Sequence, residues 1–168
     1  MKLIMSKKLS NYNRILESFI DDWGYVYYHA ILVWCGIIKD KDFLSNEMWE
    51  VYLIEHNRKI CGVAGLYSHN DNRDELWLGW FGILPELRSK GIGTKALNLV
   101  EKKALKFGCK KMMAYVDKKG KPLSFYYRNG WKRCCNVRQW MNKHPECDKS
   151  QFEGMNDHVI SKTISGNI

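Results

Sequence analysis

The sequence has few prolines, and it lacks a long hydrophobic run, a low-complexity segment and any Cys-x-x-Cys pair. Only three of its 168 residues are proline and 45% are hydrophobic, which is typical of a folded chain and not of a disordered or collagen-like one. The longest run without charged side chains lies between Asp22 and Lys39, and it is shorter than the roughly 20 apolar residues that span a bilayer. We therefore expect a single domain over residues 1–168 that has no membrane partner.

The first residues also lack the apolar region and the small-residue cleavage site of a secretory signal, so a cytoplasmic location is expected. In that compartment the six cysteines are expected to be free thiols. A zinc site would have to combine Cys134, Cys135, His144 and Cys147, but adjacent cysteines are poor tetrahedral partners and the spacing fits no common zinc module. The sequence therefore predicts no metal.

Acidic residues are scarce in the last third of the chain. The formal net charge of +9 arises entirely within residues 101–168, because residues 1–60 and 61–100 are each balanced. Such an excess favours an acidic ligand or partner, and Arg138 lies close to Trp140, as in nucleic-acid-binding surfaces. A basic nucleic-acid-associated protein is therefore one alternative function.

Hydrophobic periodicity predicts an alternation of helices and strands. Gly79 and Gly82 lie inside one predicted strand, where glycine indicates a bulge or a close approach of another group. A hairpin together with a strand-helix-strand unit implies a mixed sheet, so the predicted fold class is α/β (α+β). The predicted helices cover 13–23, 25–38, 93–107 and 122–128; the strands cover 49–55, 60–67, 75–83, 112–116, 131–137 and 158–163; a polar loop covers 139–157; and an earlier strand is reduced at most to 2–5.

A glycine-containing loop precedes the predicted helix 93–107. After Ile83 ends its strand, seven residues intervene before Gly91, and Arg88, Ser89 and Lys90 stand immediately before that glycine. Glycines let the backbone approach a ligand, and the first helical N–H groups have no partner within the helix. Because the positive end of the helix dipole lies there too, the loop predicts a pyrophosphate site.

The same residues also satisfy the dinucleotide pattern GxGxxA over 91–96, with Asp117 as a candidate ribose ligand. That fold runs its strand almost directly into the first glycine, whereas Pro85 and several charged residues intervene here. The chain after Asp117 is also too short for the rest of a dinucleotide domain. The context therefore argues against this alternative.

A second motif, FYYRNGW, follows the loop and covers residues 125–131. With the RSKGIG stretch over 88–93, it resembles the GCN5-related N-acetyltransferase (GNAT) family, whose coenzyme A loop reads (Q/R)xxGx(G/A) and whose later helix ends in FYxxxGF. The order of the predicted elements across residues 13–165 is similar to that family as well.

The resemblance implies a mixed, mostly antiparallel sheet flanked by helices, in which strands 75–83 and 112–116 splay apart. The pantetheine arm of acetyl-CoA would lie between them, against the backbone of Phe81 and Ile83. The pyrophosphate would be held by the loop, with amides from Ser89 to Thr94 and cationic contacts from Arg88 and Lys90. The loop residues concerned are Arg88, Ser89, Lys90, Gly91, Ile92, Gly93 and Thr94.

The resemblance also implies a reaction, the direct attack of an amine on the acetyl thioester in a ternary complex. Tyr126 would be the general acid toward the leaving thiolate. Glu75 is our candidate base, because alternation puts it on the same strand face as Trp77, near which members with a carboxylate base hold theirs. Glu55, His69 and a chain of water molecules remain alternatives to Glu75.

The predicted function is therefore an acetyl-CoA-dependent N-acetyltransferase that acts on a primary amine. A module that keeps the fold, binds coenzyme A and regulates without catalysis is a further alternative. The acceptor is left open among polyamines, amino acids, antibiotics, peptides and RNA-linked amines. The oligomeric state, a dimer included, is left open as well.

Overall fold

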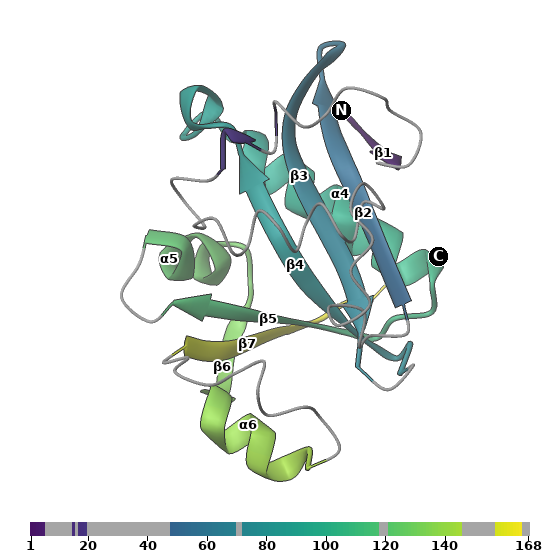
Figure 1. Ribbon diagram of the computed structural model, residues 1–168, viewed down its shortest axis with the longest axis vertical. Coiled ribbons are helices and arrows are strands. Elements are labelled where there is room, and N and C mark those ends of the chain that lie inside the picture. Colours follow the sequence, from purple (N-terminus) through teal and green to yellow (C-terminus); the bar gives the residue numbers. More distant parts are fainter. Residues whose placement is uncertain are drawn as a thin grey trace.

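A seven-stranded sheet in the order β1-β2-β3-β4-β5-β7-β6 is the centre of the computed structural model (Figure 1). The structure describes residues 1–5, 15, 17–19, 48–69, 72–117, 121–145 and 157–165. The strands are β1 (Lys2–Met5), β2 (Met48–His56), β3 (Lys59–Ser68), β4 (Glu75–Ile83), β5 (Lys111–Asp117), β6 (Lys132–Asn136) and β7 (Asp157–Thr163). The helices are the 3-10 turn η2 (Pro85–Leu87), α4 (Ile92–Lys106), α5 (Lys121–Arg128) and α6 (Val137–Lys143).

The predicted hairpin is the β2–β3 pair, and the predicted mixed, mostly antiparallel sheet is confirmed. The short first strand is present as β1, which pairs antiparallel with β2. The predicted helices over 13–23 and 25–38 lie almost wholly outside the described residues. Within the described segments, each helix is too short or too polar to pass through a bilayer.

The polar loop predicted over 139–157 is wrong at its start, because the chain forms α6 from Val137. The side chain of Asn136 accepts a hydrogen bond from the backbone N–H of Gln139, and Gln139 accepts one in return from the N–H of Asn136. This reciprocal capping box satisfies two amides that a helix start would otherwise leave unpaired. The predicted strand 131–137 therefore ends one residue early, at Asn136.

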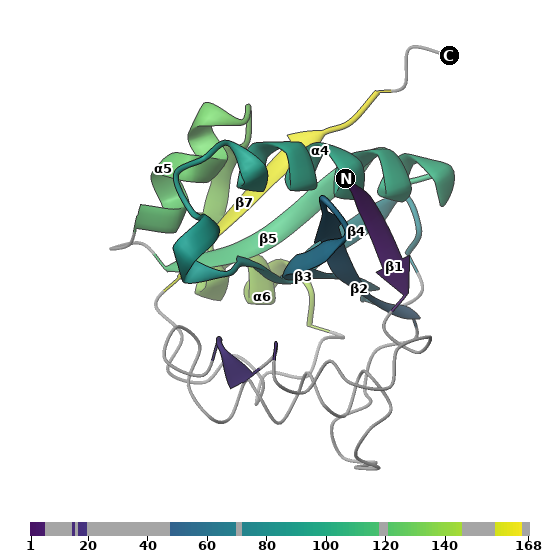
Figure 2. The ribbon, with the colours of Figure 1, turned by 90° about the horizontal axis from the view of Figure 1, so that it is seen from above.

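The helices cover both faces of the sheet, with α4 and α5 on one face and α6 on the other (Figure 2). Strand alternation sends Met112, Ala114 and Val116 of β5 into the core under α4 and α5. Met113 and Tyr115 of the same strand join the second core, which lies under α6. We refer to these two sides as the α4 face and the α6 face.

Among the described strands, β4 and β5 form the parallel pair, and they pair over only three residues. The Cα partners run from Glu75 with Lys111 to Trp77 with Met113. Beyond Trp77 the two strands run apart, and α5 lies on the open side (Figure 1). The part of β4 that β5 does not cover is about 20 Å long at roughly 3.3 Å per residue. The predicted splaying of the central strands is thus confirmed.

A β-bulge at Trp80 turns the end of β4. The register between β3 and β4 passes from Gly65 opposite Gly79 to Val63 opposite Gly82, so β4 carries one extra residue. Trp80 takes a positive φ of 54° at this point. The extra residue changes the alternation, so that Phe81 and Ile83 contact the core on the α4 face. The two glycines therefore do mark a bulge, as the sequence indicated.

The pairing of β5 with β7 places two acidic residues opposite each other, Asp117 and Asp157. Burial and the neighbouring Asp117 carboxylate raise the pKa of Asp157 above its ordinary value, against a smaller lowering by His158. A carboxyl with a raised pKa stabilises the fold while it is protonated, and this stabilisation is lost as the pH rises through the folded-state pKa.

We expect Asp157→Asn to raise the free energy of unfolding at pH 7 by about 0.5 kcal/mol, the usual size of a cross-strand pair effect. Urea unfolding at pH 7 and at pH 3 measures it. The gain should vanish at pH 3, where the carboxyl is protonated in both states. An equal gain at both pH values would show that charge is not the cause.

Candidate active site

Near the end of β4, some backbone peptide groups point toward the side where β5 has run away from β4. The backbone N–H of Leu84 donates to the carbonyl of Cys61 on β3, at 2.9 Å. Because neighbouring residues of a strand direct their peptide groups to opposite sides, those of Phe81 and Ile83 are directed away from β3. The carbonyl of Ile83 accepts a hydrogen bond from Nε of Arg88 at 2.8 Å. The peptide of Phe81 and the N–H of Ile83 thus face the side of β4 that β5, among the described strands, does not pair with.

The predicted pyrophosphate loop follows this strand end directly. It passes through η2 and then begins α4, whose N-cap Gly91 has a left-handed φ of 74° and offers no side-chain cap. The first amides of α4 therefore lack a side-chain acceptor at the positive end of the helix dipole. Lys90 donates its Nζ to the carbonyl of Glu86 at 2.9 Å. Lys90 and Arg88 thus shape the loop besides adding positive charge to it.

Two glycines of the loop have distinct reasons to be glycine. A Cβ on Gly91 would meet no atom within 4 Å, so its positive φ, and not crowding, requires the residue. A Cβ on Gly93 would instead lie 3.3 Å from the ring of Phe125 on α5. The absent side chain at Gly93 lets the start of α4 lie close to α5.

Helix α5 brings Tyr126 to the end of β4. The Tyr126 side chain is 7% exposed, and its ring centroid lies 6.5 Å from that of Phe81. Burial raises the pKa of the Tyr126 hydroxyl above its ordinary value. The phenol is therefore protonated throughout the physiological range and can donate a hydrogen bond to a developing anion.

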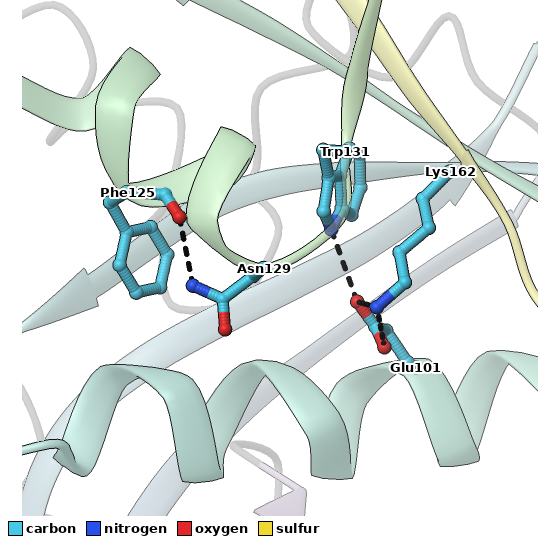
Figure 3. Close-up of polar contacts among 5 residues, drawn as sticks. All are labelled: Glu101, Phe125, Asn129, Trp131 and Lys162. Atoms are coloured by element: carbon cyan, nitrogen blue, oxygen red, sulfur yellow. Dashed lines mark hydrogen bonds and ion pairs between the residues drawn. The ribbon is translucent and has the colours of Figure 1, made fainter.

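The C-terminal end of α5 is fixed by the turn that follows it and by side chains from α4 and β7. Nδ2 of Asn129 donates to the carbonyl of Phe125 at 2.8 Å, and the N–H of Trp131 donates to the carbonyl of Tyr126 at 3.1 Å. Nε1 of Trp131 donates to Glu101 on α4 at 3.1 Å, and Glu101 also accepts from Nζ of Lys162 on β7 at 2.7 Å (Figure 3). Because Glu101 is 8% exposed, these bonds lie largely out of water.

The two predicted carboxylate bases, Glu75 and Glu55, both form ion pairs, and neither lies at the open side of the splay. Glu75 forms an ion pair with Lys111 at 3.3 Å, on the α6 face at the closed side of the splay. Tyr126 approaches from the α4 face, so the structure places these two predicted residues on opposite faces. Glu55 pairs with Lys2 at the outer edge of the sheet, at 3.2 Å.

The α6 face carries an aromatic cluster that was not predicted from the sequence. It surrounds Trp77, whose ring stacks on that of Tyr115 with centroids 4.4 Å apart. The ring of His69 stands edge-on to Trp77 at 5.1 Å. The other members are Tyr67, Trp140 and His144. Sequence spacing gave no signal for this cluster, because its members come from β3, β4, β5 and α6.

Within the described residues, no group of three or more His, Cys, Asp or Glu side chains is arranged to hold a metal ion. Of the residues considered for zinc, Cys134 contacts Ser161 at 2.9 Å and Cys135 packs in the core on the α6 face. Cys147 lies outside the described residues.

Comparisons with known proteins agree with this geometry. The family model described as the acetyltransferase (GNAT) family matches residues 11–131. A comparison with curated proteins gives no match.

Three solved structures share the fold. The N-acetyltransferase PseH of Campylobacter jejuni, in complex with acetyl coenzyme A, superposes with a TM-score of 0.62 at 18% identity, over 98% of this chain and 99% of that one. An IAA acetyltransferase of Bacillus cereus gives 0.64 at 15% identity, over 97% of each chain. GCN5 of Tetrahymena gives 0.67 at 10% identity, over 100% of this chain and 99% of that one.

We expect Glu101→Ala to lower the free energy of unfolding by about 3 kcal/mol, because it leaves the Trp131 N–H and the Lys162 ammonium without their acceptor. Glu101→Gln keeps an acceptor for Trp131 and removes the charge, so it should cost about half as much. Denaturant unfolding of the three proteins measures both effects. Equal costs for the two variants would show that packing, and not the hydrogen-bonded ion pair, stabilises this point.

Proposed function

Because the chain belongs to the GNAT family of acetyltransferases, we propose that it transfers the acetyl group of acetyl-CoA to a primary amine in a ternary complex. The observation that carries this proposal is the divergence of β4 from β5 after Trp77, with the loop before α4 and the Tyr126 helix both at the open side. If β5 stayed paired with β4 along its whole length, the peptide groups at the end of β4 would be used within the sheet.

The residues present fit coenzyme A in three respects. The peptide of Phe81 and the N–H of Ile83 supply backbone groups for the amides of a pantetheine arm, as an added strand would use them. The amides from Ser89 to Thr94 and the start of α4 suit the pyrophosphate. Gly91 leaves open space beside these amides. The loop residues assigned to this contact are Arg88, Ser89, Lys90, Gly91, Ile92, Gly93 and Thr94.

Acetyl-CoA supplies an activated thioester, and the protein supplies orientation and proton transfer. Tyr126 donates a hydrogen bond to the departing sulfur, which lowers the cost of the developing thiolate in a dry environment. A base must also remove a proton from the acceptor, since an ammonium ion has no lone pair. Glu75 remains our sequence-based candidate, and its ion pair with Lys111 would have to yield during the reaction.

The first test is calorimetric binding of acetyl-CoA to the wild type and to Gly91→Glu. We expect micromolar binding by the wild type and a loss of at least about 100-fold in the variant, because a carboxylate would stand where the loop meets the pyrophosphate. NADH should bind to neither protein. Binding of NADH in place of acetyl-CoA would favour the dinucleotide alternative.

Gly108→Glu is the matched control for Gly91→Glu. Gly108 follows the other end of α4, has a similar positive φ of 86° and also has open space at its Cβ position. The substitution therefore brings the same strain and the same charge away from the loop, and it should keep wild-type affinity. If both variants lose binding equally, backbone strain explains the loss and the assigned loop contact is wrong.

Tyr126→Phe tests the general acid. We expect kcat to fall about 100-fold with an unchanged affinity for acetyl-CoA, since the phenol acts only as the sulfur departs. Turnover is measured by mass spectrometry with spermidine, L-lysine, kanamycin and a short peptide as acceptors, which avoids reaction of thiol reagents with the protein's own cysteines. Tyr127→Phe, on the neighbouring side chain that is 44% exposed, should keep full activity.

The pH dependence of activity also tests Tyr126. Because the pKa of its hydroxyl is raised, no loss of activity from its ionisation should occur below about pH 10.

The wild type by itself tests whether the protein is a catalyst. Tight binding of acetyl-CoA with no turnover of any kind would contradict catalysis and favour a non-catalytic coenzyme A module.

A further inference from the structure

Tyr115 and His69 meet on the α6 face at the point where β5 leaves β4. Tyr115 is the second residue of β5 after Met113, the last residue that pairs with β4. Its hydroxyl lies 3.4 Å from Nε2 of His69, the residue that follows β3. This contact therefore joins the strands on either side of β4, next to the vertex of the splay.

The rings of this pair are held by the aromatic cluster. Tyr115 stacks on Trp77 at 4.4 Å, while Trp140 of α6 stands edge-on to Tyr115 at 6.1 Å and lies 5.3 Å from His69. Both members are partly exposed, so a proton that reaches the imidazole can continue to solvent. A fixed pair with access to water is what a proton relay requires.

The pair approaches the splay from the face opposite to Tyr126. Ala114 and Val116, on either side of Tyr115, point into the core that contains Tyr126. Tyr115 belongs to the core on the α6 face. A Cβ on Gly79 of β4 would lie 3.1 Å from the ring of Tyr67, so the glycine lets Tyr67 pack against β4 on that face beside Trp77. The two tyrosine hydroxyls can thus serve the two ends of one reaction from opposite sides.

We propose that Tyr115 and His69 are the proton-accepting pair of the acetyl transfer, an inference that rests on the proposed function. Tyr115 takes a proton from the ammonium of the acceptor as its own hydroxyl proton passes to Nε2 of His69, which releases it to water. The freed nitrogen forms the bond to the acetyl carbon and the carbon–sulfur bond breaks. The nitrogen loses its second proton to water, and the sulfur gains one from Tyr126, which water then restores.

Glu75 is the rival base on the same face. Its carboxylate is bound to Lys111 where β4 and β5 are still paired, whereas Tyr115 lies beyond the last pair. The backbone of Tyr115 is thus nearer to the unpaired stretch than Glu75, and its hydroxyl has His69 as a partner. Other titratable groups lie near the pair on the packed elements: Tyr67 of β3 contacts His69, His144 after α6 stacks on Trp140, and Asp117 of β5 lies opposite Asp157 of β7.

The experiment compares the wild type with Tyr115→Phe, His69→Gln, the double variant and Glu75→Gln. It measures kcat and KM with the best acceptor of the panel named above, and also the slow hydrolysis of acetyl-CoA, in which water replaces the amine. Calorimetry gives the affinity of each protein for acetyl-CoA. Tyr67→Phe is the matched control, because it removes a hydroxyl from a ring stacked on the same Trp77.

We expect each single variant of the pair to lower kcat about 100-fold with unchanged acetyl-CoA affinity. The double variant should lose no more than either single one, since the two groups act as a unit. The wild-type kcat should fall at acidic pH as the imidazole gains a proton. His69→Gln should lack this fall. In a further variant, His69→Ala, added imidazole should partly restore kcat. Tyr67→Phe should stay within about twofold of the wild type.

Retained kcat in Tyr115→Phe and His69→Gln, together with a loss in Glu75→Gln, would overturn the proposal. So would additive losses, or losses accompanied by weaker acetyl-CoA binding, because both indicate a structural role. A wild type that binds acetyl-CoA yet turns over neither an amine nor water would also overturn it. A wild type that does not bind acetyl-CoA would instead remove the proposed function itself, so the two failures are distinguishable.

Discussion

The early end of the β4–β5 ladder is the constraint on which the rest of this structure depends. The two strands share pairs only from Glu75 to Trp77, and a parallel pair needs a crossover, which α4 supplies. Because the crossover leaves from the open end of β4 and returns at the closed end, the start of α4 lies beside the unpaired peptide groups. A loop that suits an anion and a strand edge that suits an extended chain therefore become neighbours as a consequence of topology.

In the proposed reaction, the open splay makes the reacting centre accessible from both faces of the sheet. In a fully paired sheet, side chains on the two faces are separated by a continuous layer of backbone. Here Tyr126, the proposed acid, comes from the α4 face, and Tyr115, the proposed proton acceptor, comes from the α6 face. A transfer reaction needs a donor of hydrogen bonds for the leaving group and an acceptor of protons for the nucleophile. Because the hydrogen-bond donor and the proton acceptor come from opposite faces, they do not exchange a proton with each other directly.

Local patterns were sufficient for most of the described fold. The hairpin, β4, α4, β5 and α5 follow from period-two and period-3.6 patterns with clear glycine and proline boundaries, and the loop motif located the start of α4. Helix α6 was missed although Asn136 and Gln139 stand at capping-box spacing, because a short helix with a polar surface resembles a loop in composition. The aromatic cluster around Trp77 was out of reach, since it depends on register across four elements. The role of Arg88 toward the Ile83 carbonyl was hidden for the same reason.

An open sheet gives up backbone hydrogen bonds, so other contacts must hold its two halves in place. Glu101 is the clearest of these, because its carboxylate joins α4, the turn after α5 and β7 in one buried group of bonds. A buried ion pair contributes little net stability over an apolar replacement, but its hydrogen-bond directions are specific. Apolar packing alone would let α5 shift along the sheet with little change in buried area. The bond from Glu101 to Trp131 resists that shift, and Trp131 in turn bonds the carbonyl of Tyr126. The position of the proposed acid is thus fixed by a carboxylate that lies well away from the reacting atoms.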